Sequence, residues 1–190
     1  GYDSASVHAE EASGSPSRAI PSYILPVENV YSISIGEIRI PDNSQPVIVE
    51  LVPVNLAKRI HIAIDPKEIE DIEWITFTVN GIVYSVRLKD QDPQPGTAAI
   101  AAGTEWDPQT GRFTGMISVL GFYEPNEITI EVGYTDGTRE STDGRDISDI
   151  LRDLEEGETA EVELELPRNR PIGLTVSVLD WESGSGSGEV

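Results

Sequence analysis

The sequence contains no cysteine, only two histidines and few basic residues. Without cysteine, neither a disulfide nor a zinc site built on thiolates can form. The 13 Lys and Arg residues stand against 34 Asp and Glu residues, which gives a formal net charge of −21 at pH 7. This charge argues against a nucleic-acid-binding protein, because phosphate binding depends on clustered Lys and Arg. No run of about 18 apolar residues occurs, so the sequence contains no candidate membrane-spanning helix.

The length of 190 residues allows one large domain that folds without covalent crosslinks. Residues 1–18 are rich in Ser, Ala, Glu and Gly, and we expect them to form a flexible arm. Residues 182–190 are rich in Gly and Ser, and we expect a flexible tail there. This division leaves residues 19–181 as a single domain.

Alternation of apolar and polar residues predicts β-strands through most of this domain. The strand-like runs are residues 33–40, 47–52, 59–64, 113–120, 128–134, 162–166 and 172–178. The apolar residues of the run 162–166 alternate with Glu161, Glu163 and Glu165, which define the solvated face of this strand. With about seven or eight short strands, the pattern predicts an all-β fold, an antiparallel β-sandwich of the transthyretin or immunoglobulin type.

Two local signals refine this prediction. Asn80-Gly81 separates two alternating runs and is typical of a two-residue β-hairpin, so residues 75–79 are expected to pair with residues 82–86. Residues 146–156 instead show a helical stripe, with Ile147, Ile150, Leu151 and Leu154 at helical spacing. Asp146 or Ser148 could cap this short connecting helix, and Gly157 could end it.

Little in the sequence points to catalysis. With so many acidic residues, carboxylate pairs arise by chance, so a pair does not indicate a glycosidase. His8 lies in the arm and His61 in a predicted strand, so neither suggests a Ser–His pair. The acidic residues around Asp90 and between 136 and 149 could bind calcium but lack EF-hand spacing, and turns explain them. We therefore expect no enzyme activity, cofactor or metal, with a calcium-dependent adhesin as a minor alternative.

Three aromatic residues are candidates for stacking against a ligand. They are Trp74, Trp106 and Tyr123. Trp74 is expected to point outward, because its neighbours Ile75 and Phe77 set the inward phase of the strand. Aromatic rings of this kind can stack on sugars, but they also cover cores and loops. A carbohydrate-binding surface module is therefore an alternative function.

Segments in the C-terminal half resemble a known family. They are residues 113–118, residues 126–138 ending in Asp136-Gly137, Asp146-Ile147-Ser148 with its helix, and a last strand that ends at Asp180-Trp181. In this order the segments resemble the anchor and accessory subunits of Bacteroidetes fimbriae, and residues 49–62 resemble the opening strands of that family. The resemblance covers residues 48–181, about two thirds of the chain.

The resemblance implies a non-catalytic fimbrial accessory, anchor or adhesion subunit at the cell surface. It also implies an outer-membrane lipoprotein, although this chain carries neither a signal peptide nor the lipid-bearing cysteine of the family. Members usually have two transthyretin-like sandwiches, and this chain has room for one. The implied partners are fimbrial subunits that add a strand, or a surface ligand. We expect the acceptor edges in residues 33–40 and 47–52, where Gly36, Pro41, Pro46 and Pro53 interrupt regular pairing.

Overall fold

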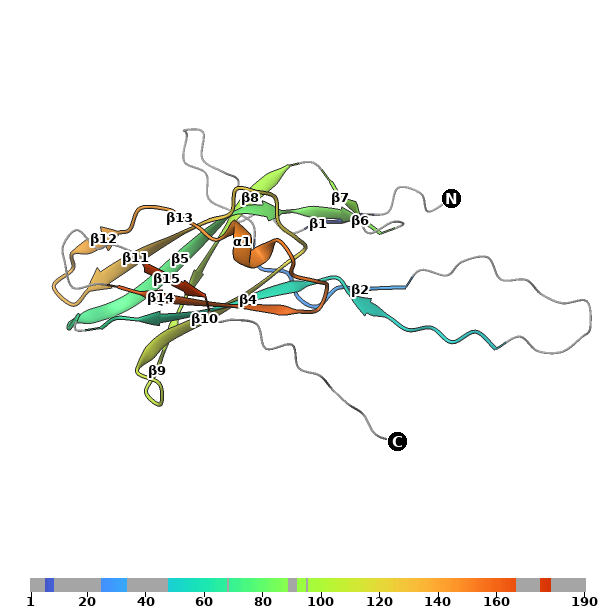
Figure 1. The fold of residues 1–190 in the computed structure, drawn as a ribbon. Helices are drawn as coiled ribbons and strands as arrows, with labels where there is room; N and C mark the ends of the chain where they lie inside the picture. The colour runs from blue at the N-terminus through green and yellow to red at the C-terminus, as the bar shows by residue number, and fades with distance from the viewer. Residues whose placement is uncertain are drawn as a thin grey trace, which may run out of the picture.

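The computed structural model describes residues 6–8, 25–33, 48–67, 69–88, 92–94, 96–166 and 175–178 (Figure 1). These residues form one short helix and many strands. The strands are β1 (Ser6–His8), β2 (Tyr31–Ser32), β3 (Val54–Asn55), β4 (Lys58–Asp65), β5 (Ile72–Val83), β6 (Ser85–Arg87), β7 (Asp92–Pro93), β8 (Thr97–Gly103), β9 (Glu105–Asp107), β10 (Arg112–Val119), β11 (Glu127–Tyr134), β12 (Arg139–Ser141), β13 (Arg145–Asp146), β14 (Thr159–Glu165) and β15 (Thr175–Val178). The helix is α1 (Ser148–Leu151).

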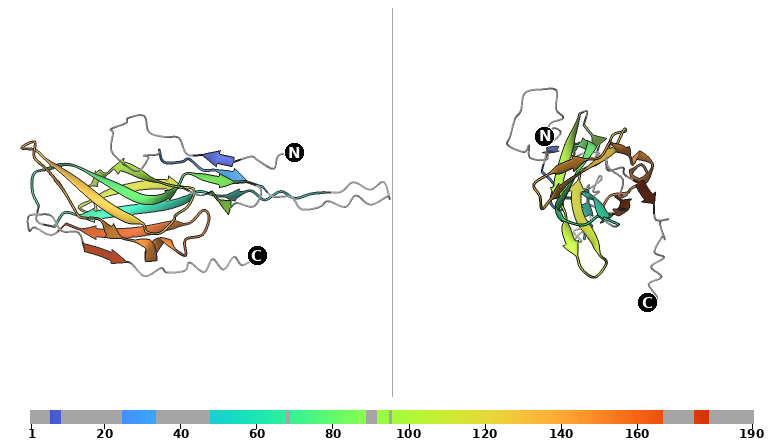
Figure 2. Two further views of the ribbon diagram at one scale, coloured as in Figure 1. Left: turned by 90° about the horizontal axis from the view of Figure 1, so that it is seen from above. Right: turned by 90° about the vertical axis from the view of Figure 1, so that its left-hand side faces the viewer.

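Two five-stranded sheets make up the body of the protein (Figure 2). One sheet has the order β15-β14-β4-β10-β9, and the other has the order β12-β11-β5-β8 with β13 also paired to β11. A small sheet β1-β6-β7 and the pair β2-β3 complete the described strands. The prediction of an all-β fold with one short helix is confirmed.

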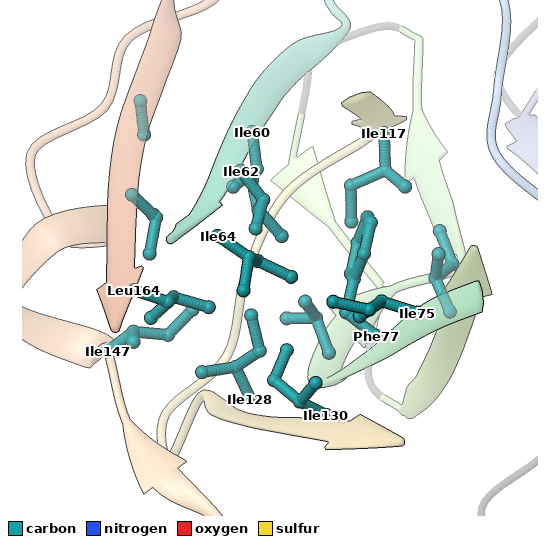
Figure 3. Packing of buried hydrophobic residues seen from close by; sticks show 14 of the residues in the cluster. Ile60, Ile62, Ile64, Ile75, Phe77, Ile117, Ile128, Ile130, Ile147 and Leu164 are labelled. Carbon is teal, nitrogen blue, oxygen red and sulfur yellow. The ribbon is translucent and has the colours of Figure 1, made fainter. Parts of the chain in front are cut away.

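A single hydrophobic cluster fills the space between the two sheets (Figure 3). Ile60, Ile62 and Ile64 of β4 are fully buried. They belong to the same cluster as Phe77 of β5 and Ile130 of β11, each 1% exposed. Burying one such side chain stabilises the fold by about 1.5–3 kcal/mol, so the alternating strands are held by their apolar faces.

Strand β4 lies at the centre of its sheet, and its two neighbouring strands run in opposite directions. It pairs antiparallel with β10, where Ile62 lies opposite Gly115, and parallel with β14, where Ile62 lies beside Val162. Every other pair among the described strands is antiparallel. The parallel pair is a feature that an antiparallel sandwich does not include, and it joins strands about a hundred residues apart.

The predicted Asn80-Gly81 hairpin is wrong. Strand β5 runs without a turn from Ile72 to Val83 and passes through both residues. Gly81 does have a φ of +75°, the left-handed conformation that a hairpin turn would need. The chain instead uses it at a β-bulge, because the pairing of β5 with β8 changes register between Val79 and Ile82.

Contacts from a distant loop explain why the chain bulges here. The Asn126 side chain is buried, and its Nδ2 donates hydrogen bonds to the carbonyl oxygens of Asn80 at 3.2 Å and Gly81 at 3.0 Å. The backbone N–H of Tyr123 also donates to the Gly81 carbonyl, at 2.8 Å. The loop after β10 thus satisfies the backbone groups that the bulge leaves without strand partners.

A hairpin here would place Ile75, Phe77, Tyr84 and Val86 in one apolar cluster, but the chain divides them. Ile75 and Phe77 lie in the main cluster. Val86 belongs to a second, smaller cluster with Val83 and Leu120, and Tyr84 is 36% exposed. The second cluster lies under the small sheet that contains β6.

The predicted helix is present but shorter than residues 146–156. α1 covers Ser148–Leu151, and Asp146 precedes it, accepting hydrogen bonds at Oδ1 from the backbone N–H (2.8 Å) and the hydroxyl (2.5 Å) of Ser148. These bonds hold the pKa of Asp146 below its usual value of 3.8. The inward stripe is confirmed, since Leu151 and Leu154 are buried in the main cluster.

The expected arm is partly structured. Ser6–His8 form β1, which pairs antiparallel with β6. The division of the chain into a flexible arm, a domain and a tail stays a prediction. The rest of residues 1–18, the tail 182–190 and most of the predicted strand 33–40 lie outside the described residues. The predicted strand 47–52 is not formed in its described part: residues 48–53 belong to no strand, and β3 begins at Val54.

Replacing Gly81 by Val should lower the free energy of unfolding by about 2 kcal/mol or more. A β-branched residue resists positive φ, and a Cβ at this position would lie 2.5 Å from Asn126 Nδ2 and 2.4 Å from the Tyr123 carbonyl oxygen. Gly103→Val is the matched control, because no atom lies within 4 Å of a Cβ there. Equal urea midpoints for the two variants would contradict the bulge assignment.

Candidate functional site

Trp74 lies on the outer side of β5, as the sequence predicts. Its neighbours Ile75 and Glu73 are buried and exposed, respectively, and Trp74 itself is partly buried. A Cβ added at Gly133 of β11 would lie 2.1 Å from the indole Cε2, so the ring is pressed against a glycine that leaves room for it. The Arg139 guanidinium carbon lies 5.3 Å from the ring centroid, in a cation–π arrangement. A ligand that stacks on this ring would therefore compete with Arg139.

Trp106 and Tyr123 occupy other parts of the molecule. Trp106 is on the edge strand β9, where its ring centroid lies 4.9 Å from that of Phe113, and it is 50% exposed. Tyr123 lies in the loop after β10, and its hydroxyl donates a hydrogen bond to the Pro93 carbonyl at 3.2 Å. In the described part of the chain, no ring contact joins any two of the three predicted stacking residues. Among them, Trp106 is the most exposed, at 50% against 38% for Tyr123, whereas Trp74 is partly buried.

The outer face of the β10-β4-β14 sheet carries a row of ion pairs. The pairs are His61 with Glu161, Arg112 with Glu163, and Lys67 with both Asp65 and Glu165. Arg112 of β10 reaches Glu163 of β14 across β4, where Ala63 lies beside Glu163 and opposite Thr114. The glutamates of β14 do form an outer face, as predicted, and each has a side-chain partner across the sheet. Such exposed pairs contribute little stability individually, about 0–1 kcal/mol.

Charge pairing changes the ionisation of this row. Burial raises the pKa of Asp65, but the hydrogen bonds from the Lys67 backbone and side chain outweigh it, so the net pKa lies below 3.8. The same contacts, with Glu165 contributing most, raise the pKa of Lys67. The hydrogen bond with Glu163 likewise raises the pKa of Arg112. These groups therefore stay charged at neutral pH and are poor candidates for acid–base catalysis.

Neither a metal site nor a membrane-spanning helix is found in the described regions. No group of three or more His, Asp or Glu side chains there could hold a metal ion. None of the helices described is long and apolar enough to cross a membrane.

A two-stranded ribbon extends beyond one end of the sandwich (Figures 1 and 2). We define this N-terminal ribbon as residues 25–33 and 48–57, which contain β2 and β3. The ribbon is attached to the body by the Val27 N–H, which donates to the Ser118 carbonyl at 2.9 Å. Within the ribbon, the Leu56 N–H donates to the Val30 carbonyl at 2.7 Å. Leu56 is 2% exposed, so the base of the ribbon is well packed.

Beyond this base, the N-terminal ribbon is apolar and exposed. It carries most of the large hydrophobic side chains that the described structure exposes: Leu25, Tyr31, Ile33, Ile48, Val49, Leu51, Val52 and Val54. The whole stretch from residue 48 to residue 54 is exposed. From the sequence we expect the apolar run at 47–52 to be a strand of the sandwich, and its pattern does not distinguish an exposed run from a buried one.

A second exposed backbone runs from β8 into β9. Residues 101–107 pass from one sheet to the other, and each of them is at least partly exposed. Among the described strands, β8 pairs only with β5 and β9 only with β10. Ala101, Gly103 and Trp106 are exposed along this edge. The end of β8, residues 101–103, carries no charged side chain, and an edge of this kind can accept another strand.

Comparisons with known proteins identify the fold. No protein-family model matches the sequence, and no curated protein matches it. Among solved structures, a candidate adhesin from Bacteroides ovatus ATCC 8483 aligns with a TM-score of 0.60 and 14% identity, over 95% of this chain and 69% of its own. A second candidate adhesin from Bacteroides ovatus aligns with a TM-score of 0.51 and 11% identity, over 88% of this chain and 61% of its own.

The fimbrial anchor protein Mfa2 from Porphyromonas gingivalis also aligns, with a TM-score of 0.48 and 11% identity, over 84% of this chain and 61% of its own. That score is too low to establish a common fold. The two Bacteroides structures share the β-rich fold of this chain, which spans about two thirds of their length.

Replacing Lys67 by Met should raise the pKa of Asp65 toward 3.8, because the side-chain hydrogen bond and charge of Lys67 are lost. The pKa of Asp65 is lower in the folded chain than its usual value of 3.8. Its ionised carboxylate therefore stabilises the folded state above pH 3.8, and this contribution is lost as the pH falls through the folded-state pKa. The variant should lose part of this acid dependence. Carboxyl ¹³C titration by NMR measures the pKa, with Lys58→Met as control. An unchanged Asp65 titration would contradict the assignment.

Proposed function

We propose that this chain is a non-catalytic cell-surface subunit, a fimbrial accessory, anchor or adhesion protein held at the outer membrane. The observation that carries the proposal is the fold likeness to a candidate Bacteroides adhesin, with a TM-score of 0.60 over 95% of this chain. On the described sheet face Arg112 is paired with Glu163 and Lys67 with Glu165, and groups that stay charged in this way suit a structural surface better than acid–base catalysis.

The family-like segments support the same proposal. Residues 113–118 lie in β10, residues 127–134 form β11, and Asp136-Gly137 turns the chain toward β12. Gly137 has a φ of +82°, and Asp136 Oδ1 accepts the Thr138 N–H at 2.9 Å. Asp146-Ile147-Ser148 then leads into α1. The segments that resemble fimbrial anchor and accessory subunits thus follow one another through the core of the sandwich.

The exposed edge at residues 101–107 is the surface we propose for contact with fimbrial subunits. A strand from a neighbouring subunit could extend either sheet there through backbone hydrogen bonds. From the sequence alone we expect the acceptor edges in residues 33–40 and 47–52. Residues 34–47 lie outside the described structure, and residues 48–53 belong to no described strand. The β8–β9 edge is a continuous part of both sheets and suits strand addition better.

The test uses cells that produce the full-length protein. We expect antibodies against the purified chain to label intact cells, and protease added outside to remove the label. A photo-crosslinking amino acid at Ala101 should capture a fimbrial subunit, identified by mass spectrometry. The same probe at Asp153, which is exposed beside α1, should not. A protein found only inside the cell, or equal capture from both positions, would overturn the proposal.

A second function, as a carbohydrate-binding surface module, is favoured by one observation. Trp106 is 50% exposed on an edge strand, and its tilted contact with Phe113 fixes the ring in place. An aromatic ring that is both exposed and immobilised can stack on a sugar at low entropic cost. Trp74 and Tyr123 remain candidates for the same role, each already in contact with Arg139 or Pro93.

A glycan array on the purified chain tests this second function. If a glycan binds, Trp106→Ala should weaken its affinity by about tenfold or more, because an exposed stacking contact is removed. Met116→Ala removes another exposed apolar side chain and should leave the affinity unchanged. Binding that survives Trp106→Ala, or no binding to any glycan, would exclude this site.

A further inference from the structure

The N-terminal ribbon is an unusual surface for an acidic chain. Its 25–33 and 48–57 segments contain two acidic residues, Glu28 and Glu50, and no Lys or Arg, although the whole chain has a net charge of −21. Its most exposed apolar side chains are Ile48 at 92% and Val52 at 71%. A protein rarely presents a contiguous apolar surface to water unless a partner covers it.

The ribbon also lacks the support that short strands need. β2 and β3 are two residues each, and among the described strands they pair only with each other. An isolated two-stranded ribbon is marginally stable in water, and further strands or a hydrophobic partner are needed. Consecutive residues Leu51 and Val52 are 49% and 71% exposed, so apolar side chains point in more than one direction. A partner must therefore both extend the ribbon and cover it.

We propose that the partner is a second copy of this chain, joined ribbon to ribbon about a twofold axis. With no basic residue and two acidic ones, the ribbon offers little for a partner that recognises charge. It offers apolar side chains and strand edges that no other described strand occupies, and an identical ribbon is complementary to both. In a twofold contact the same patch serves on both copies, so no second surface is required.

The position of the ribbon removes the main obstacle to this contact. Two bodies of the same negative charge repel one another, but the ribbon extends beyond the end of the sandwich, so the bodies stay apart when the ribbons meet (Figure 2). Charges farther apart than about 8–10 Å are largely screened at physiological salt. Added salt screens the repulsion between the bodies and strengthens apolar contact, so we expect a dimer that strengthens as salt is added.

Sedimentation velocity over a wide range of protein concentration tests the proposal. The wild-type chain should shift from monomer to dimer, and Val52→Lys should weaken dimerisation by about tenfold or more. This substitution makes the net charge less negative, so a stronger repulsion between the two acidic bodies cannot explain the loss. Met116→Lys is the matched control, because Met116 is 56% exposed on β10, outside the ribbon, and the charge change is identical.

A disulfide scan gives a second readout. The chain has no cysteine, so a single cysteine introduced at Ile48, Leu51, Val52 or Val54 reports only on the ribbon. At least one of these positions should form a covalent dimer under mild oxidation, whereas Met116→Cys should not. Unchanged melting temperatures would show that the variants fold. A wild-type chain that stays monomeric at all concentrations, or equal effects of Val52→Lys and Met116→Lys, would overturn the proposal and leave the ribbon to a different protein.

Discussion

Burial of one set of branched side chains between two sheets is the interaction on which this structure depends. β4, β5 and β11 each direct isoleucines inward, and these side chains belong to one cluster with Val162 and Leu164 of β14. The other features are arranged around that cluster. Leu151 of α1 is buried in it, and the ion pairs lie on the opposite face of β4. Val27, at the base of the N-terminal ribbon, packs against its edge. A functional surface must therefore be sought on edges and projections, because the interior is fully committed to packing.

Much of the fold could be predicted because alternation is a local property. β4, β10, β11 and β14 were all indicated by their apolar faces, and the buried stripe of α1 by its spacing. The Asn80-Gly81 bulge could not be predicted, because the positive φ of Gly81 suits a turn equally well. The choice is made by Asn126, a residue 45 positions away that bonds to the Gly81 carbonyl. Tertiary hydrogen bonds here override a strong local preference.

The candidate surfaces were less predictable than the fold. The outward phase of Trp74 followed from its neighbours, but its contacts with Gly133 and Arg139 depend on how β5, β11 and β12 pair. The apolar run near Leu51 looks like any buried strand, and only its position beyond the sheets leaves it exposed. The Arg112–Glu163 pair likewise requires β10 and β14 to flank β4 at Ala63. None of these placements is encoded in a short stretch of sequence.

The parallel pairing of β4 with β14 has a consequence for how the chain is made. β4 ends at Asp65, and its neighbour β14 begins only at Thr159, so the centre of one sheet cannot be assembled until most of the chain is available. Contacts between such distant segments fold slowly. A chain that emerges from the ribosome N-terminus first therefore holds β4 without its parallel neighbour until β14 has been made, and the apolar face of β4 stays incompletely covered during that time.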